Sequence, residues 1–144
     1  MAFVTRNHPK LTLEGARAVL AAAHRRAEEI KIPMDIAVVD DGGHLLAFER
    51  MDGAKLSSIE ISLVKARASA MRRAPTGPAM AGDQVNVPLA LGLAVASSKT
   101  QTPIRGGVPL IVDGQVVGAI GVSAGNEDQD SDVARAGAAA IEKA

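Results

Sequence analysis

Cysteine is absent from the chain and aromatic side chains are almost absent, with two phenylalanines and neither tryptophan nor tyrosine. The lack of cysteine excludes disulfide frameworks, thiolate nucleophiles and cysteine-ligated zinc or iron–sulfur centres. Proteins that bind single-stranded nucleic acid stack bases on aromatic side chains, which this chain cannot supply in number. Basic and acidic residues balance at 16 each, so no net charge attracts nucleic acid or an anionic membrane. We therefore expect neither a nucleic-acid partner nor a membrane partner.

Long hydrophobic runs are absent as well. No stretch approaches the ~18 uninterrupted apolar residues of a membrane-spanning helix, and the first ten residues lack the apolar run of a signal peptide. We expect a cytoplasmic protein. A length of 144 residues fits one domain over residues 1–144. A domain of this size buries about 70% of the surface of its unfolded chain, which is enough for a core without covalent staples.

Three long helices are predicted from hydrophobic periodicity and capping residues, over about 13–31, 58–73 and 127–142. Thr12 and Asn126 are the expected N-caps of the first and last. Ser57 and Glu60 have the spacing of a capping box at the start of the second. A short apolar helix is predicted within 87–97.

The helix predicted over about 58–73 has two apolar stripes on nearly opposite faces. One stripe can cover a sheet, and the other requires a second cover. We expect that cover to be another subunit, so the sequence predicts self-association through this helix. The stripes are Ile61, Val64, Ala68 and Met71 on one side and Ile59, Leu63, Ala66 and Ala70 on the other.

Two β-hairpins are predicted, each followed by a helix. The first joins strands 35–40 and 44–50 through Asp41-Gly42-Gly43, and the second joins 108–112 and 115–122 through Asp113-Gly114. The same strand–turn–strand–helix unit thus occurs twice. Local hairpins combined with helices predict a layered α+β domain rather than a parallel dinucleotide-binding fold.

The irregular segment 74–107 ends in Arg105-Gly106-Gly107, directly before the second hairpin. Two glycines let the backbone approach a ligand, and their amides together with Arg105 can hold a carboxylate or phosphate. The alternative is a simple bend that leads into a strand.

Lys65 falls at the edge of the buried face of its helix. Its amine either points into a pocket, where it can move a proton, or extends to water along the protein surface. The same two alternatives hold for Arg50, at the end of a strand, and for Asp40, at the first hairpin turn.

Three histidines are present, His8, His24 and His44, and none is spaced to form a two-histidine metal motif. We therefore expect no metal site. His24 or His44 is a candidate axial ligand for haem, and the alternative is an ordinary surface histidine.

Several segments, taken in order, resemble the GlcG/HbpS-like haem-degrading domain family, which includes proteins like the C-terminal part of PduO. The resemblance covers residues 11–142. Its segments are Leu11-Thr12-Leu13, Ala37 to Gly43, Phe48 to Ala54, Lys65-Ala66, Pro75-Thr76, Gly106 to Leu110, Asp113 to Ser123, and Gln129-Asp130. Ser123-Ala124 departs from the Ser-Gly of many relatives.

The resemblance implies a three-layer α/β/α, profilin-like sandwich around a mainly antiparallel sheet of about five strands. It also implies homo-oligomers. Some relatives bind haem or iron, and others occur beside genes for small-molecule catabolism.

Three functions follow as hypotheses. The first is an oligomeric small-molecule-binding protein with haem as the candidate ligand, held by His24 or His44 and by Arg105 or Lys65 at its propionates, with Arg50 as a further ligand-binding candidate. The second is a cofactor-independent isomerase, hydratase or hydrolase that acts on a small oxygenated catabolic intermediate. The third is a structural or regulatory oligomer.

In the enzyme hypothesis, Arg105 and the amides of Gly106 and Gly107 bind a carboxylate or enolate. Lys65 or Asp40 moves the proton.

Overall fold

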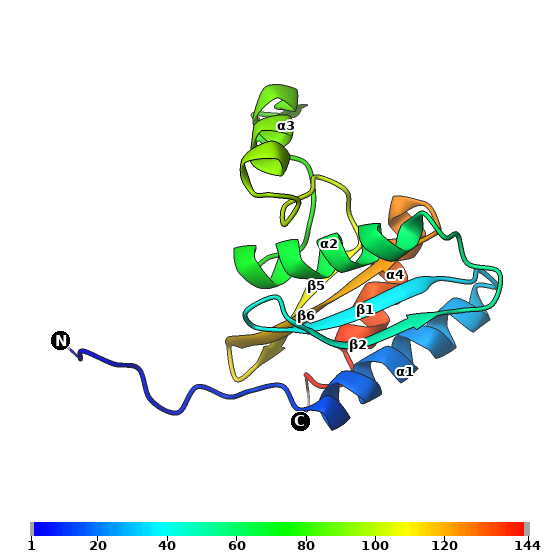
Figure 1. The fold of residues 1–144 in the computed structure, drawn as a ribbon, viewed down its shortest axis with the longest axis horizontal. Helices are drawn as coiled ribbons and strands as arrows, with labels where there is room; N and C mark the ends of the chain where they lie inside the picture. Colours follow the sequence, from blue (N-terminus) through cyan, green and yellow to red (C-terminus); the bar gives the residue numbers. More distant parts are fainter. Residues whose placement is uncertain (1, 143–144) are drawn as a thin grey trace.

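The computed structural model describes residues 2–142 and shows an α+β domain, as the sequence predicts (Figure 1). Its four helices are α1 (Leu13–Glu29), α2 (Ser58–Arg72), α3 (Val87–Ala96) and α4 (Glu127–Ala138). Its strands are β1 (Asp35–Asp40), β2 (Leu45–Arg50), β3 (Met80–Ala81), β4 (Gln84–Val85), β5 (Gly107–Val112) and β6 (Gln115–Ser123).

The central sheet is antiparallel throughout and has the strand order β2-β1-β6-β5. Four strands form it, where about five were expected, because the short strands β3 and β4 pair only with each other. The register places Gly121 of β6 between Ala37 of β1 and Gly107 of β5. Strands β2 and β5 are consequently the two opposite edges of the sheet, which decides which candidate residues can meet.

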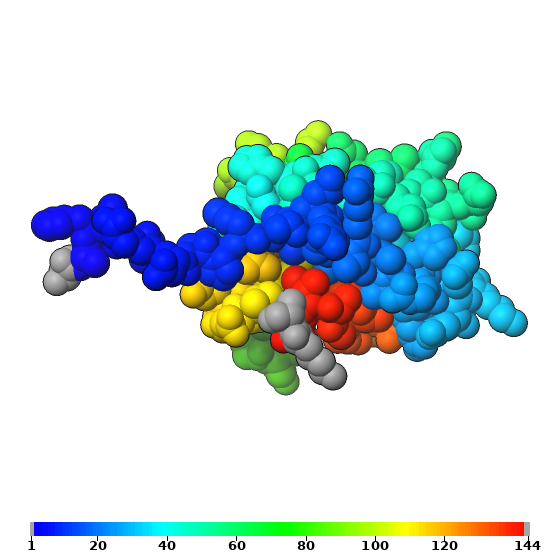
Figure 2. Space-filling model, turned by 90° about the horizontal axis from the view of Figure 1, so that it is seen from below, coloured from blue at the N-terminus to red at the C-terminus, as the bar shows by residue number. Residues whose placement is uncertain are grey.

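The helices form a layer on each side of the sheet. Helix α2 packs on one face against β1, β5 and β6, whereas α1 and α4 pack against each other on the other face. Figure 2 views the second face, with α1 in blue beside α4 in red, and the N-terminal segment extends away from the body. The expected arrangement of three layers is therefore confirmed.

Small residues bring α2 unusually close to the sheet. Its side of the core consists of Ala37, Val39, Ala66, Ala70 and Ala119. The Cα atoms of Gly121 and Gly107 lie so near the backbone carbonyls of Ser62 and Lys65 that an added Cβ would collide with them. Glycine in a strand commonly marks such a close backbone approach. The larger core, built around Val19, Ile36, Val38, Leu110 and Ile120, lies under α1 and α4.

The N-caps of α1 and α4 are confirmed. Thr12 Oγ1 accepts a hydrogen bond from the Gly15 amide at 3.0 Å, and Asn126 forms a reciprocal capping box with Gln129. The capping box predicted at Ser57 is wrong, since its side chain makes no capping hydrogen bond. The chain already turns one residue earlier, with the Ser58 amide bonded to the carbonyl of Lys55. Ser57 therefore has helical dihedral angles instead of the extended ones that an N-cap needs.

Residues 77–104, which we call the arm, leave the body between α2 and β5 and carry β3, β4 and α3. The predicted short helix is confirmed as α3, and it projects beyond α2 on the far side from the sheet (Figure 1). None of the helices within residues 2–142 is long and apolar enough to cross a bilayer.

Candidate functional site

A buried ion pair joins α2 to α4. The Nζ atom of Lys65 donates hydrogen bonds to Asp130 Oδ2 at 2.8 Å and to the Val122 carbonyl at 2.9 Å. The two charged side chains are 1% and 4% exposed. Lys65 therefore turns inward and does not extend to water. Its side chain extends from α2 past the sheet, so that its ammonium contacts the Val122 carbonyl of β6 and reaches Asp130 near the start of α4 in the opposite layer.

Gly106 makes this crossing feasible. Its φ is +122°, a conformation that residues with a Cβ rarely adopt. A Cβ added there would lie 2.9 Å from both Lys65 Nζ and Asp130 Cβ. The other carboxylate oxygen of Asp130 accepts a hydrogen bond from the Gly125 amide at 2.9 Å. The pair is thus held by backbone groups on both sides as well as by its own attraction.

Burial raises the pKa of Asp130 above its ordinary value, even though the hydrogen bond and the charge of Lys65 act to lower it. A carboxylate and an ammonium in this setting form a proton donor–acceptor pair. Both line an open depression of about 510 Å³, which we call the lysine depression. Its other polar walls are Lys55, Ser57, Ser58, Ser123, Asn126 and Glu127.

A second cavity of about 460 Å³ lies at the outer edge of β5, and we call it the arginine cavity. Arg73, Arg105 and Arg135 line it, from three separate segments of the chain. Glu142 contributes a carboxylate to the lining, and Val108, Pro109 and Ile111 contribute apolar walls. Guanidinium groups suit carboxylate and phosphate oxygens, so the cavity favours an anion with an apolar body.

Two hydrogen bonds join the segment that follows Arg73 to the segment that follows Arg105. The Gly107 amide donates to Thr76 Oγ1 at 2.9 Å, and the Thr76 amide donates to the Gly107 carbonyl at 3.0 Å. Because Thr76 closely follows Arg73, and Gly107 closely follows Arg105, this exchange holds the two arginine-bearing segments side by side. It also means that the Gly107 amide, which was expected to bind an anion, is already bonded to Thr76.

Arg105 itself is exposed and interacts with the acidic start of α4. Its amide donates to Glu127 Oε1 at 2.8 Å, and its Nη1 lies 2.9 Å from Asp128 Oδ1. The Asp128 side chain is 83% exposed. An exposed pair of this kind is weak, so a bound anion can compete for the Arg105 guanidinium.

The remaining candidates lie apart from these two cavities. His24, on α1, is paired with Glu49 on the edge strand β2 and lies 3.4 Å from Glu28. The hydrogen bond that the His24 ring donates to the Glu49 carboxylate is the main reason that the pKa of His24 is raised. Arg50 ends β2, opposite Asp35 in the register. His24 and Arg50 therefore belong to the edge opposite β5.

Asp40 and His44 shape the first hairpin turn. Asp40 Oδ1 accepts hydrogen bonds at 2.9 Å from the amides of Gly42 and His44. The His44 side chain is 83% exposed and lies 3.3 Å from Asp40. His8 contacts Gln115 and Asp41 from the N-terminal segment. The structure thus brings Lys65 next to Gly106 and Gly107, which directly follow Arg105, although Lys65 and Arg105 line different cavities. Asp40, Arg50, His24 and His44 lie elsewhere.

Sequence reasoning missed four residues of the site, Arg73, Thr76, Asp130 and Arg135. In the sequence, Asp130 is only one of several acids at the positive end of a helix. Both Asp130 and Thr76 occur in segments that carry the family resemblance, which was the available signal. Arg135 had none, because a single arginine on a helix is ordinarily solvated.

The sequence matches the family model described as "Haem degrading protein HbpS-like" over residues 11–139. The chain belongs to this family. Protein GlcG of Escherichia coli strain K12 is 40% identical over 113 residues, which span 78% of this chain and 81% of GlcG.

Solved structures agree with the assignment to the HbpS-like family. The Klebsiella pneumoniae protein ORFY superposes with a TM-score of 0.84 at 30% identity, covering 99% of both chains. A crystal structure of a complex of PduOC with haem superposes with a TM-score of 0.79 at 26% identity, covering 92% of this chain and 96% of that one. The HbpS-like fold and a haem-bound relative are thus both represented among its neighbours.

Proposed function

We propose that this HbpS-like protein binds a small anionic molecule with an apolar body in the arginine cavity, with haem as the candidate ligand. The observation that carries the proposal is the convergence of Arg73, Arg105 and Arg135 on one cavity with apolar walls. A haem-bound relative supports the choice of candidate.

The residues of the cavity fit one part of haem and not another. Guanidinium groups suit the two propionates, and Val108, Pro109 and Ile111 suit the edge of an apolar ring. Within residues 2–142, neither the arginine cavity nor the lysine depression has a histidine in its lining. We therefore propose that the arginines recognise haem through its propionate carboxylates, and we assign no axial ligand and no iron chemistry to this cavity.

Titration of the purified protein with haemin, followed by absorbance, tests the proposal. Saturable binding of one haemin per chain is expected, weakened at least tenfold by Arg105→Ala and by Arg135→Ala. Arg17→Ala is the matched control, since Arg17 is an exposed arginine on α1. Binding that is non-saturating, or that is equally strong in Arg105→Ala and wild type, contradicts the proposal.

The same titration also tests the alternative that a histidine is the axial ligand of haem. His24→Ala and His44→Ala remove the two candidate axial ligands that lie away from the cavity. Our proposal expects both variants to bind haemin as wild type does. If one of these variants loses the haem absorption band, haem binds on the β2 side of the molecule and not in the arginine cavity.

The lysine depression supports a second candidate function, a cofactor-independent enzyme for a small oxygenated metabolite. The observation that favours it is the Lys65–Asp130 pair, in which burial raises the pKa of Asp130 toward the range useful for moving a proton. Incubation with a panel of small hydroxy and oxo acids in D₂O, monitored by proton NMR, detects proton abstraction whatever product is formed. Deuterium uptake that Asp130→Asn abolishes and Arg17→Ala preserves supports this function. No uptake from any acid counts against it.

A further inference from the structure

Two buried serine hydroxyls line the lysine depression and have no partner within residues 2–142. Ser58, the first residue of α2, is 4% exposed, and Ser123, the last residue of β6, is 5% exposed. The similarly buried Ser62 and Ser69, in contrast, donate their hydroxyl protons to nearby backbone carbonyls. A buried hydroxyl without a hydrogen bond costs free energy. Ser58 and Ser123 are therefore suited to bind a molecule that enters the depression.

The nearest internal candidate for a bond to Ser123 does not make one. Asp35 lies opposite Ser123 in the register of β1 and β6, and its carboxylate is an acceptor for a hydroxyl proton. Neither oxygen of Asp35 has a hydrogen-bond partner within the described chain, and Asp35 does not contribute to the lining of the depression. The Ser123 hydroxyl is consequently left for a molecule in the depression.

The packing of α2 on β6 places the two hydroxyls in the same part of the depression. Gly121 of β6 lies so near the Ser62 carbonyl of α2 that an added Cβ would collide with it. Ser123 follows two residues further along the strand, a distance of about 6.6 Å. Ser58 precedes Ser62 by four helical residues, a distance of about 6 Å. Because both serines line one depression, the two steps lead to the same place.

The lining of the depression carries no net charge. The ammonium of Lys65 is paired with Asp130, and the exposed Lys55 and Glu127 have opposite charges. The other polar groups are three serine hydroxyls and the amide of Asn126, all of them neutral. In contrast to the arginine cavity, the depression therefore gives an anion no overall electrostatic advantage.

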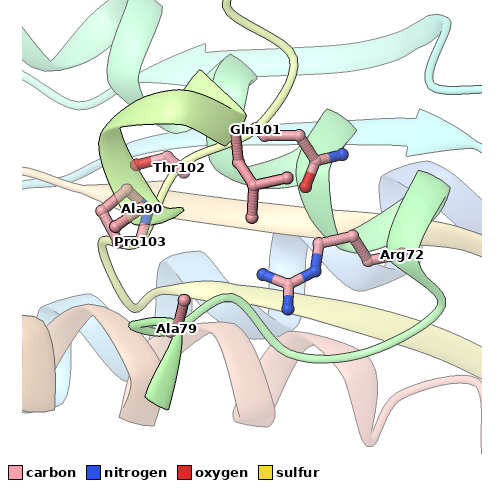
Figure 3. A pocket seen from close by; sticks show the side chains of 8 residues that line it. Arg72, Ala79, Ala90, Gln101, Thr102 and Pro103 are labelled. Carbon is pink, nitrogen blue, oxygen red and sulfur yellow. The ribbon is translucent and has the colours of Figure 1, made fainter. Parts of the chain in front are cut away.

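The cavity between the arm and the body offers no alternative site for a small molecule. It holds only about 10 Å³, where Arg72 extends from α2 toward the arm and Gln101, Thr102 and Pro103 lie along the returning chain (Figure 3). That volume accommodates about one water molecule, whereas the lysine depression holds about 510 Å³.

The neutral polar lining indicates the class of ligand. Serine hydroxyls both donate and accept hydrogen bonds, so they match the hydroxyl groups of a ligand, which do the same. Ile61 and Ile104 add apolar walls, which suit a short carbon chain. We propose that the lysine depression binds a small polyol or hydroxycarbonyl compound through its hydroxyl groups, held by Ser58 and Ser123, and that no charged group of the ligand is required.

This inference rests on the second candidate function for its site and names the class of molecule that the site takes. It concerns binding, and it does not require that the bound molecule react. The hydroxyls select the molecule, and the buried Lys65–Asp130 pair lies beside it in the same depression.

Titration of the isotope-labelled chain with glycerol, followed by the amide NMR spectrum, tests the proposal. Saturable shifts are expected, with a dissociation constant on the order of millimolar for a ligand of so few atoms. Ser58→Ala and Ser123→Ala should each weaken binding by about fivefold or more, and the double variant should abolish it. Ser62→Ala is the matched control and should bind as wild type does, because its hydroxyl is already bonded to the Ile59 carbonyl.

Glycerate separates recognition of hydroxyls from recognition of charge, since a carboxylate replaces one hydroxymethyl group of glycerol. We expect glycerate to bind no more tightly than glycerol does. Tighter binding of glycerate overturns the proposal, because the depression would then be an anion site. The absence of saturable shifts up to about 100 mM glycerol overturns it too, as does glycerol binding that the double serine variant leaves unchanged.

The experiment also distinguishes this inference from the enzyme function. If the chain binds glycerol through the two serines but promotes no deuterium uptake, the inference stands and the second candidate function fails. If Asp130-dependent deuterium uptake occurs without serine-dependent binding of glycerol, the function stands and the inference is overturned.

Discussion

The ammonium of Lys65 lies 2.8 Å from Asp130 Oδ2, with both side chains almost completely buried. The two residues belong to helices on opposite faces of the sheet, and they meet beside Gly106 at the start of β5. Because two charges have been removed from water, each depends on the other for compensation.

Removal of one member of this pair should therefore destabilise the fold strongly. We expect Lys65→Met to lower the free energy of unfolding by about 3–5 kcal/mol, because it leaves a buried carboxylate without its cation. Urea denaturation followed by circular dichroism measures the change. Arg105→Ala, which breaks only the exposed pair with Asp128, should cost less than about 1 kcal/mol.

The double variant Lys65→Met, Asp130→Leu completes the test. Both charges are then absent, so its loss of stability should be smaller than that of Lys65→Met alone. The single variant Asp130→Leu is measured alongside. If the loss of stability in the double variant equals the sum of the losses in Lys65→Met and Asp130→Leu, the two side chains do not interact in the folded state, which contradicts the ion pair.

Gly106 should be among the least replaceable residues of the chain. Gly106→Ala adds a Cβ within 2.9 Å of Lys65 Nζ and 2.7 Å of the Val122 carbonyl, at a φ of +122°. We expect a clearly lower melting temperature. Gly92→Ala is the opposite case, since nothing lies within 4 Å of an added Cβ in the middle of α3. It should leave the stability unchanged or raise it by up to about 1 kcal/mol.

If Gly106→Ala melts at the same temperature as wild type, the Lys65 ammonium does not pack against Gly106 as closely as the structure indicates.

Asp35 provides a pH-dependent test. It is fully buried, and neither carboxylate oxygen has a hydrogen-bond partner within residues 2–142. Burial raises the pKa of Asp35, with a smaller opposing effect of Arg50. Between the ordinary pKa and this raised value the folded state holds the proton more often than the unfolded state does. The contribution of Asp35 to stability therefore falls as the pH rises through that window, and it is constant above the window.

Asp35→Asn removes this titration. We expect the variant to gain stability relative to wild type as the pH rises through the window, measured by urea denaturation at a series of pH values. A difference between variant and wild type that is constant with pH contradicts the raised pKa. Comparison with wild type is needed because the pKa of Asp41 is lowered, chiefly by its hydrogen bond with Lys10, so its effect on stability has the opposite slope.

Local patterns in the sequence predicted the elements of this fold well. The structure confirms the two predicted hairpin turns and two of the predicted helix caps, all of which depend on residues close together in the chain. The turns are at Gly42-Gly43 and Asp113-Gly114, and the caps are Thr12 and Asn126. The prediction that Ser57 caps its helix was wrong because a helical turn already begins before Ser57. Whether a capping residue acts depends on the dihedral angles of the chain that enters the helix.

The site was less predictable because long-range contacts assemble it. Lys65 is separated from Asp130 by 65 positions, and the Thr76–Gly107 exchange spans 31. Periodicity placed Lys65 at the edge of a buried face but gave no indication of its partner. The sheet order then separated Lys65 and Arg105 from Arg50 and His24, which occupy the opposite edge. Strand order of this kind does not follow from the pattern of any single segment.

Recognition of an apolar ligand through its carboxylates, by Arg105 and Arg135, is the core of the proposed function. Titration with metal-free protoporphyrin IX and with its dimethyl ester, followed by fluorescence, tests it most directly because neither probe contains iron. We expect the free acid to bind wild type at least tenfold more tightly than the ester, and Arg105→Ala with Arg135→Ala to remove this difference. Equal affinity of wild type for acid and ester would contradict recognition through the carboxylates.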